Sequence, residues 1–171
     1  ENVVVSNNIQ VLNAADKLIL PGVGNYSTAI GKINELGLDK QLEDLVLGKH
    51  MPILGICLGM QLLGCSSTES GSNLGLGLVK GTVEKFCKSE LKVPHVGYNQ
   101  VKPCVNSRLY TDVCDDPDFY FTHSYRMLSK VDIGQSYCCY GDRFVASFEF
   151  DNIAGVQFHP ELSQKNGLQL I

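Results

Sequence analysis

The sequence lacks both an apolar run that could cross a membrane and a dense cluster of positive charge. A membrane-spanning helix needs about 20 mostly apolar residues, and the apolar runs here are much shorter. Lysine and arginine are scattered along the 171 residues, and the net charge is −4. Nucleic-acid surfaces need a clustered basic patch, so neither nucleic acid nor a membrane is expected as a partner. The first residues also lack the features of a secretory signal, which favours a cytoplasmic protein.

The chain also lacks any Cys-x-x-Cys pair, although it contains seven cysteines. An odd number without paired spacing argues against a zinc site or a disulfide framework, so we expect no metal and no cofactor. We interpret six cysteines as small buried hydrophobic side chains in a reducing compartment. Cys138 and Cys139 adjoin in a strand-like run, so their side chains should point to opposite faces.

Neither an internal repeat nor a change in composition divides the chain, which favours one domain. With 44% apolar and 19% charged residues, the chain can bury a sizeable core. Its first half alternates between strand-like and helix-like segments, the rhythm of a parallel sheet covered by helices. The strand-like segments are residues 3–5, 17–20 and 52–56, and the helix-like segments are residues 26–36, 38–46 and 58–63. Gly37 is the predicted stop of the first helix.

The second half is richer in strands. The candidates are residues 78–86, 96–102, 119–125, 136–140, 145–150 and 153–158. Asp151-Asn152 suits a two-residue hairpin turn between the last two strands. We therefore predict an α/β fold whose mixed, mostly parallel sheet is covered by helices, with antiparallel strands in the C-terminal half. Residues 66–75 form the most loop-like stretch and could border a site.

Cys57 stands between two glycines, in Gly55-Ile56-Cys57-Leu58-Gly59, directly after an apolar run. This pattern is typical of a nucleophile at the tip of a tight strand-to-helix turn, as in the G-x-S-x-G elbow. The glycines allow strained backbone angles and leave room for a substrate. We predict that the N-terminus of the following helix stabilises a thiolate at Cys57.

A histidine and a carboxylate lie two residues apart in Gln157-Phe158-His159-Pro160-Glu161. Alternate residues of an extended segment share a face, so His159 and Glu161 are predicted to point the same way. His159 can take the thiol proton and return it to a leaving amine, while Glu161 orients the imidazole. Together with Cys57 they could form a Cys-His-Glu relay.

The turn Pro21-Gly22-Val23-Gly24 follows a predicted parallel strand, so it belongs at the same edge of the sheet as Cys57. The N–H of Leu58 and an N–H from Val23 or Gly24 are candidate oxyanion donors. Each of these motifs alone is more often structural than catalytic. Their joint occurrence at predicted strand ends favours a cysteine hydrolase.

These motifs resemble those of the class I, triad-type glutamine amidotransferases. The resemblance covers almost the whole chain and rests on residues 18–24, 55–61, 92–99, 119–125 and 157–161. Within the family, residues 92–99 and 119–125 are most similar to the glutaminase subunit of imidazole glycerol phosphate synthase, from histidine biosynthesis. The resemblance implies a flavodoxin-like fold and hydrolysis of L-glutamine to glutamate and ammonia through a thioester on Cys57. It also implies that glutamine is bound by Gly24, Gln61, Ser124 and Tyr125.

The resemblance further implies a partner, a (β/α)₈-barrel synthase subunit that forms a heterodimer with the glutaminase and receives its ammonia. With that partner, the pair has a lyase-type synthase activity. The segment that contains His95, Gly97, Tyr98 and Asn99 matches a region near the docking face. In such pairs the glutaminase subunit is typically almost silent until the partner binds its ligand, and the turn at residues 21–24 is the natural gate.

The chain departs from the family pattern in three places. It starts at what resembles the second strand, so residues 1–171 are expected to form one amidotransferase domain without the family's first strand and helix or its closing helix. Tyr98 stands where the histidine-pathway subunit usually has tryptophan, and Leu162 stands where lysine is usual.

Three alternatives stay open. The departures at Tyr98 and Leu162 suggest a paralogue that supplies ammonia for amidino groups on bacterial surface sugars. A self-sufficient cysteine hydrolase acting on another amide would need no partner. A non-catalytic binding module on the same scaffold would have no need of all three relay residues.

Overall fold

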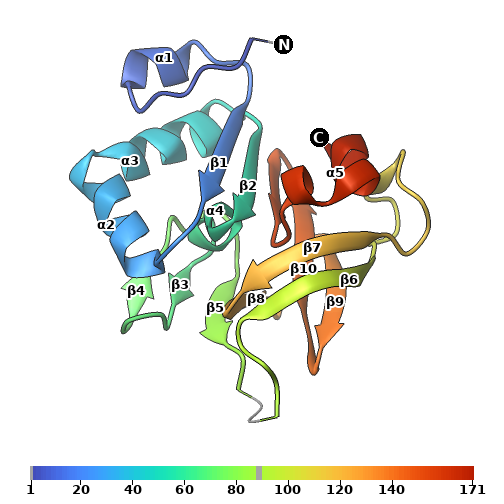
Figure 1. The fold of residues 1–171 in the computed structure, drawn as a ribbon. Coiled ribbons are helices and arrows are strands. Elements are labelled where there is room, and N and C mark those ends of the chain that lie inside the picture. Colours follow the sequence, from blue (N-terminus) through green and yellow to red (C-terminus); the bar gives the residue numbers. More distant parts are fainter. Residues whose placement is uncertain (1, 88–89) are drawn as a thin grey trace.

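A computed structural model describes residues 2–87 and 90–171, and Figure 1 shows their arrangement. The first half of the chain forms the predicted βαβ unit. Strand β1 (Leu18–Gly22) pairs in parallel with β2 (Ile53–Cys57), and helix α2 (Tyr26–Glu35) lies between them in the sequence. Gly37 ends this helical segment with a φ of +66°, as predicted, because glycine adopts left-handed angles without strain. The other helical elements of this half are α1 (Ile9–Asn13), α3 (Leu38–Glu43), the π-helical turn η1 (Asp44–Gly48) and α4 (Leu58–Leu62).

The second half is dominated by strands, as predicted. Its strands are β3 (Ser66–Ser67), β4 (Asn73–Leu74), β5 (Thr82–Lys85), β6 (His95–Lys102), β7 (Asp118–His123), β8 (Tyr125–Leu128), β9 (Gln135–Tyr140), β10 (Asp142–Phe150) and β11 (Ile153–Val156). Its helical elements are the 3-10 turns η2 (Arg108–Tyr110) and η3 (Pro160–Leu162) and helix α5 (Gln164–Leu170). The predicted hairpin turn at Asp151-Asn152 is confirmed, because β10 and β11 pair antiparallel on either side of it.

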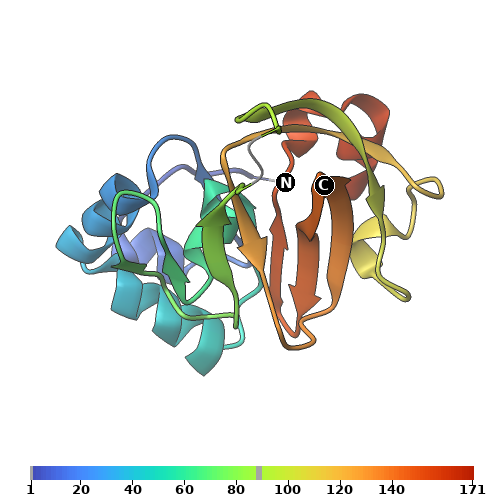
Figure 2. The same ribbon diagram turned by 90° about the horizontal axis from the view of Figure 1, so that it is seen from below.

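The sheet is mixed, in the order β1-β2-β11-β10-β8-β5-β3-β4, with β9 beside β10 and β6 between β9 and β7. Parallel pairing is confined to β1 with β2, β2 with β11, and β3 with β5. Antiparallel ladders therefore make up more of the sheet than the sequence predicts. Figure 2 shows helices α2 and α3 beside one part of the sheet and the long strands of the second half in the other part.

Several predicted elements are shorter than expected. Residues 3–5 form no strand and their valine side chains are largely exposed, since β-branched residues alone do not make a strand without a ladder partner. The strand predicted at 78–86 is limited to β5, and the run 119–125 is divided at Ser124 into β7 and β8. The stretch 66–75 is a loop with the two short strands β3 and β4.

The cysteines are less buried than the sequence suggests. Cys138 is buried and Cys139 is exposed, which confirms their opposite faces. Apart from Cys57, however, Cys138 is the only buried cysteine of the seven, all of which lie within the described ranges and are free thiols. Four are exposed because they lie in loops, near loop ends or on the outward face of a strand: Cys65, Cys87, Cys114 and Cys139.

The hydrophobic core consists of two clusters of buried side chains. One is centred on the helices and parallel strands of the first half, and the other on the aromatic side chains of β7 and β10. Strands β2 and β11, which pair in parallel, contribute to both. The loops that follow β1, β2, β7 and β11 meet where the clusters adjoin, and the pocket described below lies there. No helix within residues 2–87 and 90–171 has both the length and the apolar character needed to span a bilayer.

Candidate active site

Cys57 forms a strained turn between β2 and α4. Its φ of +54° and ψ of −110° lie outside the regions that L-residues favour, at a cost of about 1–3 kcal/mol. The tight turn predicted from the sequence is therefore confirmed. Gly59 is required by packing, because a Cβ at this position would lie 1.7 Å from the carbonyl oxygen of Leu20 in β1. Helix α4 can therefore approach the parallel strands closely enough to hold Cys57 at their C-terminal edge.

The Cys57 thiol is buried, with 7% of the residue exposed. Burial raises the pKa of this thiol to about 11, because a thiolate would lose its hydration. A hydrogen bond from the Leu58 backbone and one from the Gln157 side-chain amide, at 3.7 Å from the sulfur, oppose this rise. Burial therefore favours the neutral thiol, whereas the Leu58 N–H at the start of α4 favours the thiolate that the sequence predicts.

His159 and Glu161 are paired, as the sequence predicts, but through the 3-10 turn η3 and not through an extended segment. Nδ1 of His159 lies 2.7 Å from Oε1 of Glu161, and a carboxylate can only accept, so Nδ1 carries the proton. Nε2 is then an unprotonated acceptor, and this buried atom has no hydrogen-bond partner within the described part of the chain. The backbone N–H of His159 donates to the carbonyl of Tyr120, which fixes the histidine to β7.

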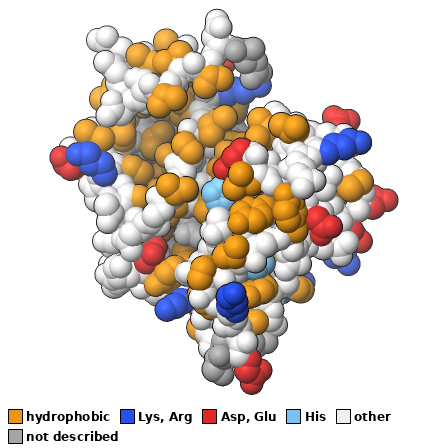
Figure 3. Space-filling model, viewed as in Figure 1, with side chains coloured by type: hydrophobic (Ala, Val, Ile, Leu, Met, Phe, Trp, Pro, Cys, Tyr) orange, Lys and Arg blue, Asp and Glu red, His pale blue; other side chains and the backbone are white. Residues whose placement is uncertain are grey.

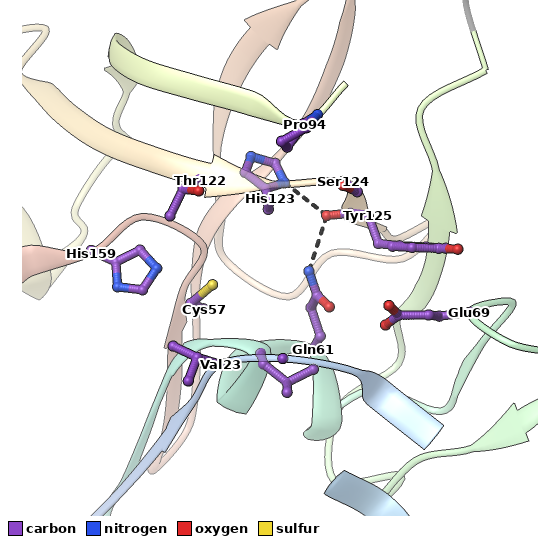
Figure 4. A pocket seen from close by; sticks show the side chains of 12 residues that line it. Val23, Cys57, Gln61, Glu69, Pro94, Thr122, His123, Ser124, Tyr125 and His159 are labelled. Atoms are coloured by element: carbon purple, nitrogen blue, oxygen red, sulfur yellow. Dashed lines mark hydrogen bonds between the residues drawn. The ribbon is translucent and has the colours of Figure 1, made fainter. Parts of the chain in front are cut away.

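Cys57 and His159, 102 positions apart in the sequence, line one pocket of about 340 Å³ (Figure 4). This volume is at the lower end of the range for small-molecule sites, which suits a ligand of amino-acid size. The first half of the chain provides the nucleophile side of the pocket and the second half the base side. The pocket is lined by Val23, Gly24, Cys57, Leu58, Gln61, Glu69, Pro94, Thr122, His123, Ser124, Tyr125 and His159.

The residues named from the sequence as oxyanion donors all reach this pocket. Leu58 follows the nucleophile, and its N–H hydrogen-bonds toward the Cys57 sulfur. Val23 and Gly24 come from the end of β1, and Gly24 has a φ of +98°, which favours glycine. The turn therefore lies in the same pocket as the nucleophile.

Gln61, Ser124 and Tyr125 also line the pocket. The side chain of Gln61 is buried, and its Nε2 donates to the carbonyl of Tyr125 at 3.0 Å and to Oε1 of Gln157 at 2.8 Å. These two acceptors fix the orientation of the amide. Ser124 and Tyr125 stand where β7 ends and β8 begins.

Two functional candidates were missed by sequence reasoning. Glu69 lies in the loop predicted to border a site, and its carboxylate lines the pocket near Gln61 (Figure 4). Its Oε2 accepts from the backbone N–H of Tyr26 at 2.9 Å, at the start of α2. Gln157 belongs to the motif that contains His159, but only the fold shows that its amide contacts the nucleophile. No spacing rule connects either residue to Cys57.

The segment expected near a partner lies on β6, beside the pocket. Tyr98 is half-exposed, and its hydroxyl donates to the Leu162 carbonyl at 2.7 Å, next to the loop of the base. Gly97 and Asn99 are partly exposed. The expectation for His95 needs correction: only 3% of it is exposed, because its ring stacks between Tyr140 and Phe121 inside the second core cluster.

Known proteins match this chain along almost its whole length. The family model for glutamine amidotransferase class-I matches residues 2–170. The chain is 45% identical over 169 residues to imidazole glycerol phosphate synthase subunit HisH of Pectobacterium atrosepticum, covering 98% of this chain and 83% of the relative. It is 42% identical over 168 residues to subunit HisH 1 of Campylobacter jejuni strain 81-176, covering 98% and 84%.

The fold is also found among solved structures. The glutaminase domain of CTPS from Trypanosoma brucei, with acivicin bound, matches with a TM-score of 0.64 over 95% of this chain and 72% of that one. Its sequence identity of 16% supports a common fold only. The family is shown instead by the match of residues 2–170 and by relatives above 40% identity. This chain belongs to the class-I glutamine amidotransferases.

Proposed function

We propose that this chain is the glutaminase subunit of an imidazole glycerol phosphate synthase, acting in histidine biosynthesis in the cytoplasm. The relatives that it matches at 42–45% identity are named imidazole glycerol phosphate synthase subunit HisH. The observation that carries the catalytic part is the meeting of a thiol and an imidazole in one pocket. The thiol lies on a strained turn, the imidazole Nδ1 is held by a carboxylate, and Nε2 has no partner among the residues that the structure describes.

The first chemical step follows from the protonation states of these groups. The Cys57 thiol is neutral because of its raised pKa, so it cannot attack until a base removes its proton. Nε2 of His159 is the available acceptor in the pocket. As sulfur bonds to the side-chain amide carbon of glutamine, the proton passes to His159, and Glu161 stabilises the imidazolium.

The second step uses the same groups in reverse. The negative charge that develops on the amide oxygen needs donors, which the N–H of Leu58 and the turn at Val23 and Gly24 can provide. His159 returns its proton to the departing nitrogen, so ammonia leaves and a glutamyl thioester remains on Cys57. Water, deprotonated by His159, then hydrolyses the thioester to glutamate and restores the thiol.

We assign recognition of the substrate to the end of the pocket that lies away from Cys57 and His159. A free glutamine carries an ammonium and a carboxylate, and the half-buried Glu69 carboxylate suits the ammonium. The side chain of Gln61 uses its amide N–H groups within the protein, which leaves its carbonyl oxygen for a ligand. Ser124, Tyr125 and Gly24 are proposed to complete the binding site around the substrate's backbone groups.

The surface around the pocket supports a protein partner. Figure 3 shows hydrophobic side chains gathered in the middle of this face of the molecule, around a histidine. Val23, Val96, Tyr98 and Leu162 are about half-exposed or more, and exposed apolar clusters of this kind mark interaction sites. We assign this face to the (β/α)₈-barrel synthase subunit, which would receive the ammonia before it is protonated in bulk water.

The test is glutamate release from L-glutamine by the full chain, alone and with the barrel subunit of imidazole glycerol phosphate synthase. We expect release to depend on the barrel subunit and to be lost in Cys57→Ala. Cys139→Ala is the matched control, because this cysteine is exposed and its side chain points away from the core. Unchanged release by Cys57→Ala would refute the assigned nucleophile.

The same assay separates the other functions considered from the sequence. A self-sufficient hydrolase would turn over an amide without the barrel and would ignore glutamine. A non-catalytic module would bind the barrel without releasing glutamate. Failure with this barrel, but activity with a barrel from surface-sugar biosynthesis, would support the paralogue instead.

A further inference from the structure

Two buried histidines have no part in the proposed chemistry. His95 on β6 and His123 on β7 face each other in the antiparallel register, and only 3% and 7% of these residues are exposed. Their rings are in contact, with Nδ1 of His95 lying 3.1 Å from Nε2 of His123. Buried polar groups need hydrogen-bond partners, so the protonation of the pair can be worked out from what surrounds it.

Only one arrangement of protons satisfies every contact. Nδ1 of His123 lies 2.7 Å from the Tyr125 carbonyl, which can only accept, so this nitrogen carries a proton. Nε2 of neutral His123 is then an acceptor, and Nδ1 of His95 must donate to it. Nε2 of His95 is left as an acceptor, and the side-chain amide of Asn99 lies 3.4 Å from it as a donor.

The surroundings keep both rings neutral, as this arrangement requires. Burial lowers the pKa of His95 to about 4 and that of His123 to about 3. His95 stacks on Tyr140 with ring centres 4.0 Å apart, and Phe144 lies 5.1 Å from the ring centre of His123. Two neutral rings with fixed tautomers form a rigid donor chain, directed from Asn99 toward Tyr125.

This chain of donors ends at the pocket. The Tyr125 carbonyl accepts from both His123 and Gln61, as the dashed lines in Figure 4 show. Gln61 also donates to Gln157, whose own amide lies 3.7 Å from the Cys57 sulfur. His123 therefore fixes the carbonyl that orients Gln61, at the point where the chain turns from β7 to β8.

We propose that His123, held in its tautomer by His95, is a positioning residue for glutamine binding that acts through the Tyr125 carbonyl and Gln61. The inference rests on the proposed function, because it takes the ligand to be glutamine. Both ring nitrogens of His123 are used within the protein, so the residue does not act on the substrate directly. Without the donor at Nδ1, the Tyr125 carbonyl would keep only Gln61 as a donor of this pair, and Gln61, Ser124 and Tyr125 would be positioned less firmly.

The test compares two reagents that alkylate Cys57, of which only one must first bind in the pocket. A glutamine-mimicking diazo ketone alkylates Cys57 only after its amino-acid end is bound, whereas iodoacetamide needs the thiol alone. Rates of Cys57 modification are measured by peptide mass spectrometry on the full chain, with and without the barrel subunit. In His123→Phe we expect the diazo ketone reaction to slow by about tenfold or more, as for loss of a buried donor. The iodoacetamide rate should change less than about twofold.

Matched variants separate positioning from a loss of folding. His123→Asn can place an amide N–H near the position of Nδ1 and should recover most of the diazo ketone rate. Tyr110→Phe removes a different buried hydrogen bond, of 2.7 Å to Ser147, and should lower thermal stability without changing either rate. If His123→Phe does not fold, His95→Phe is used instead, because this variant keeps the ring stacking and removes the donor to His123. Its rate of Cys57 modification by the diazo ketone should be about threefold lower than that of the wild type.

The outcomes also distinguish this inference from the proposed function. Absence of diazo ketone labelling in the wild type would overturn both, because the pocket would not accept a glutamine side chain. Normal labelling of the wild type together with equal labelling of His123→Phe would overturn only the role of His123. Equal slowing of both reagents would also overturn it, since His123 would then support the nucleophile rather than the substrate site.

Discussion

The strongest prediction concerns the ionisation of Cys57. Burial raises the pKa of this thiol from 9.0 to about 11. Because only the thiolate reacts with alkylating agents, Cys57 at neutral pH should carry about 100-fold less reactive sulfur than an unperturbed cysteine. A cysteine hydrolase with a thiolate formed in advance would show the opposite behaviour.

The assay is alkylation by iodoacetamide from pH 6 to pH 10, followed at each cysteine by peptide mass spectrometry. The exposed Cys87, Cys114 and Cys139 serve as references in the same molecule. We expect the Cys57 rate to rise about tenfold per pH unit across the whole range, since its raised pKa lies above it.

Limited access and weak ionisation can be separated in the same data. Poor access lowers the rate by the same factor at every pH, whereas ionisation determines the pH at which the rate levels off. A Cys57 rate that is already constant below pH 8 would refute the reasoning. It would mean that His159 and Cys57 form an ion pair before substrate binds.

Three further predictions follow from the geometry. Glu161→Gln should lower the rate of glutamate release by about 100-fold or more, because the carboxylate orients the imidazole. Thermal stability should change little, because the Glu161 side chain is 55% exposed. An unchanged rate of release in the presence of the barrel subunit would contradict this prediction. Gly59→Ala should lower the free energy of unfolding, measured in urea, by about 3 kcal/mol or more, because the new Cβ would clash with the Leu20 carbonyl. In the control Gly31→Ala in α2, the new Cβ meets no atom within 4 Å, so the free energy of unfolding should rise by about 0.5–1 kcal/mol. The melting temperature should fall as the pH drops from 6.5 toward 4, because His95 and His123 bind protons in the unfolded chain but stay neutral in the folded protein. In His95→Phe the melting temperature should fall less steeply over this range.

The sequence could predict those parts of the fold that depend on local signals. The strand before Cys57 and the helix after it follow from an apolar run and two glycines, and both glycines make contacts that no side chain would allow. The turn at Asp151-Asn152 follows from residues that tolerate left-handed angles, and Asp151 has a φ of +57°. His159 and Glu161 do meet, but residues 160–162 form the 3-10 turn η3 and not the extended segment that the sequence predicts.

What the sequence could not predict depends on contacts between distant segments. The run 119–125 is uniformly strand-like, yet it divides at Ser124, where the chain turns from β7 to β8 beside the pocket. His95 belongs to a motif that resembles a docking segment, but its position in β6 points it into an aromatic core. Glu69 carries no local signal, because only the packing of its loop against α2 brings the carboxylate to the pocket.

The two reacting residues of the pocket are equally buried, but different elements hold them. The nucleophile is held by strand β2, by the buried helix α4 and by the buried side-chain amide of Gln157. Two hydrogen bonds hold the segment that carries the base. The His159 backbone N–H donates to the Tyr120 carbonyl, and the Tyr98 hydroxyl donates to the carbonyl of Leu162, three residues after His159. Tyr98 and Leu162 are half-exposed on the face assigned to the partner. A protein bound to that face would therefore contact the segment that carries the base directly, whereas it could reach the sulfur only through the pocket.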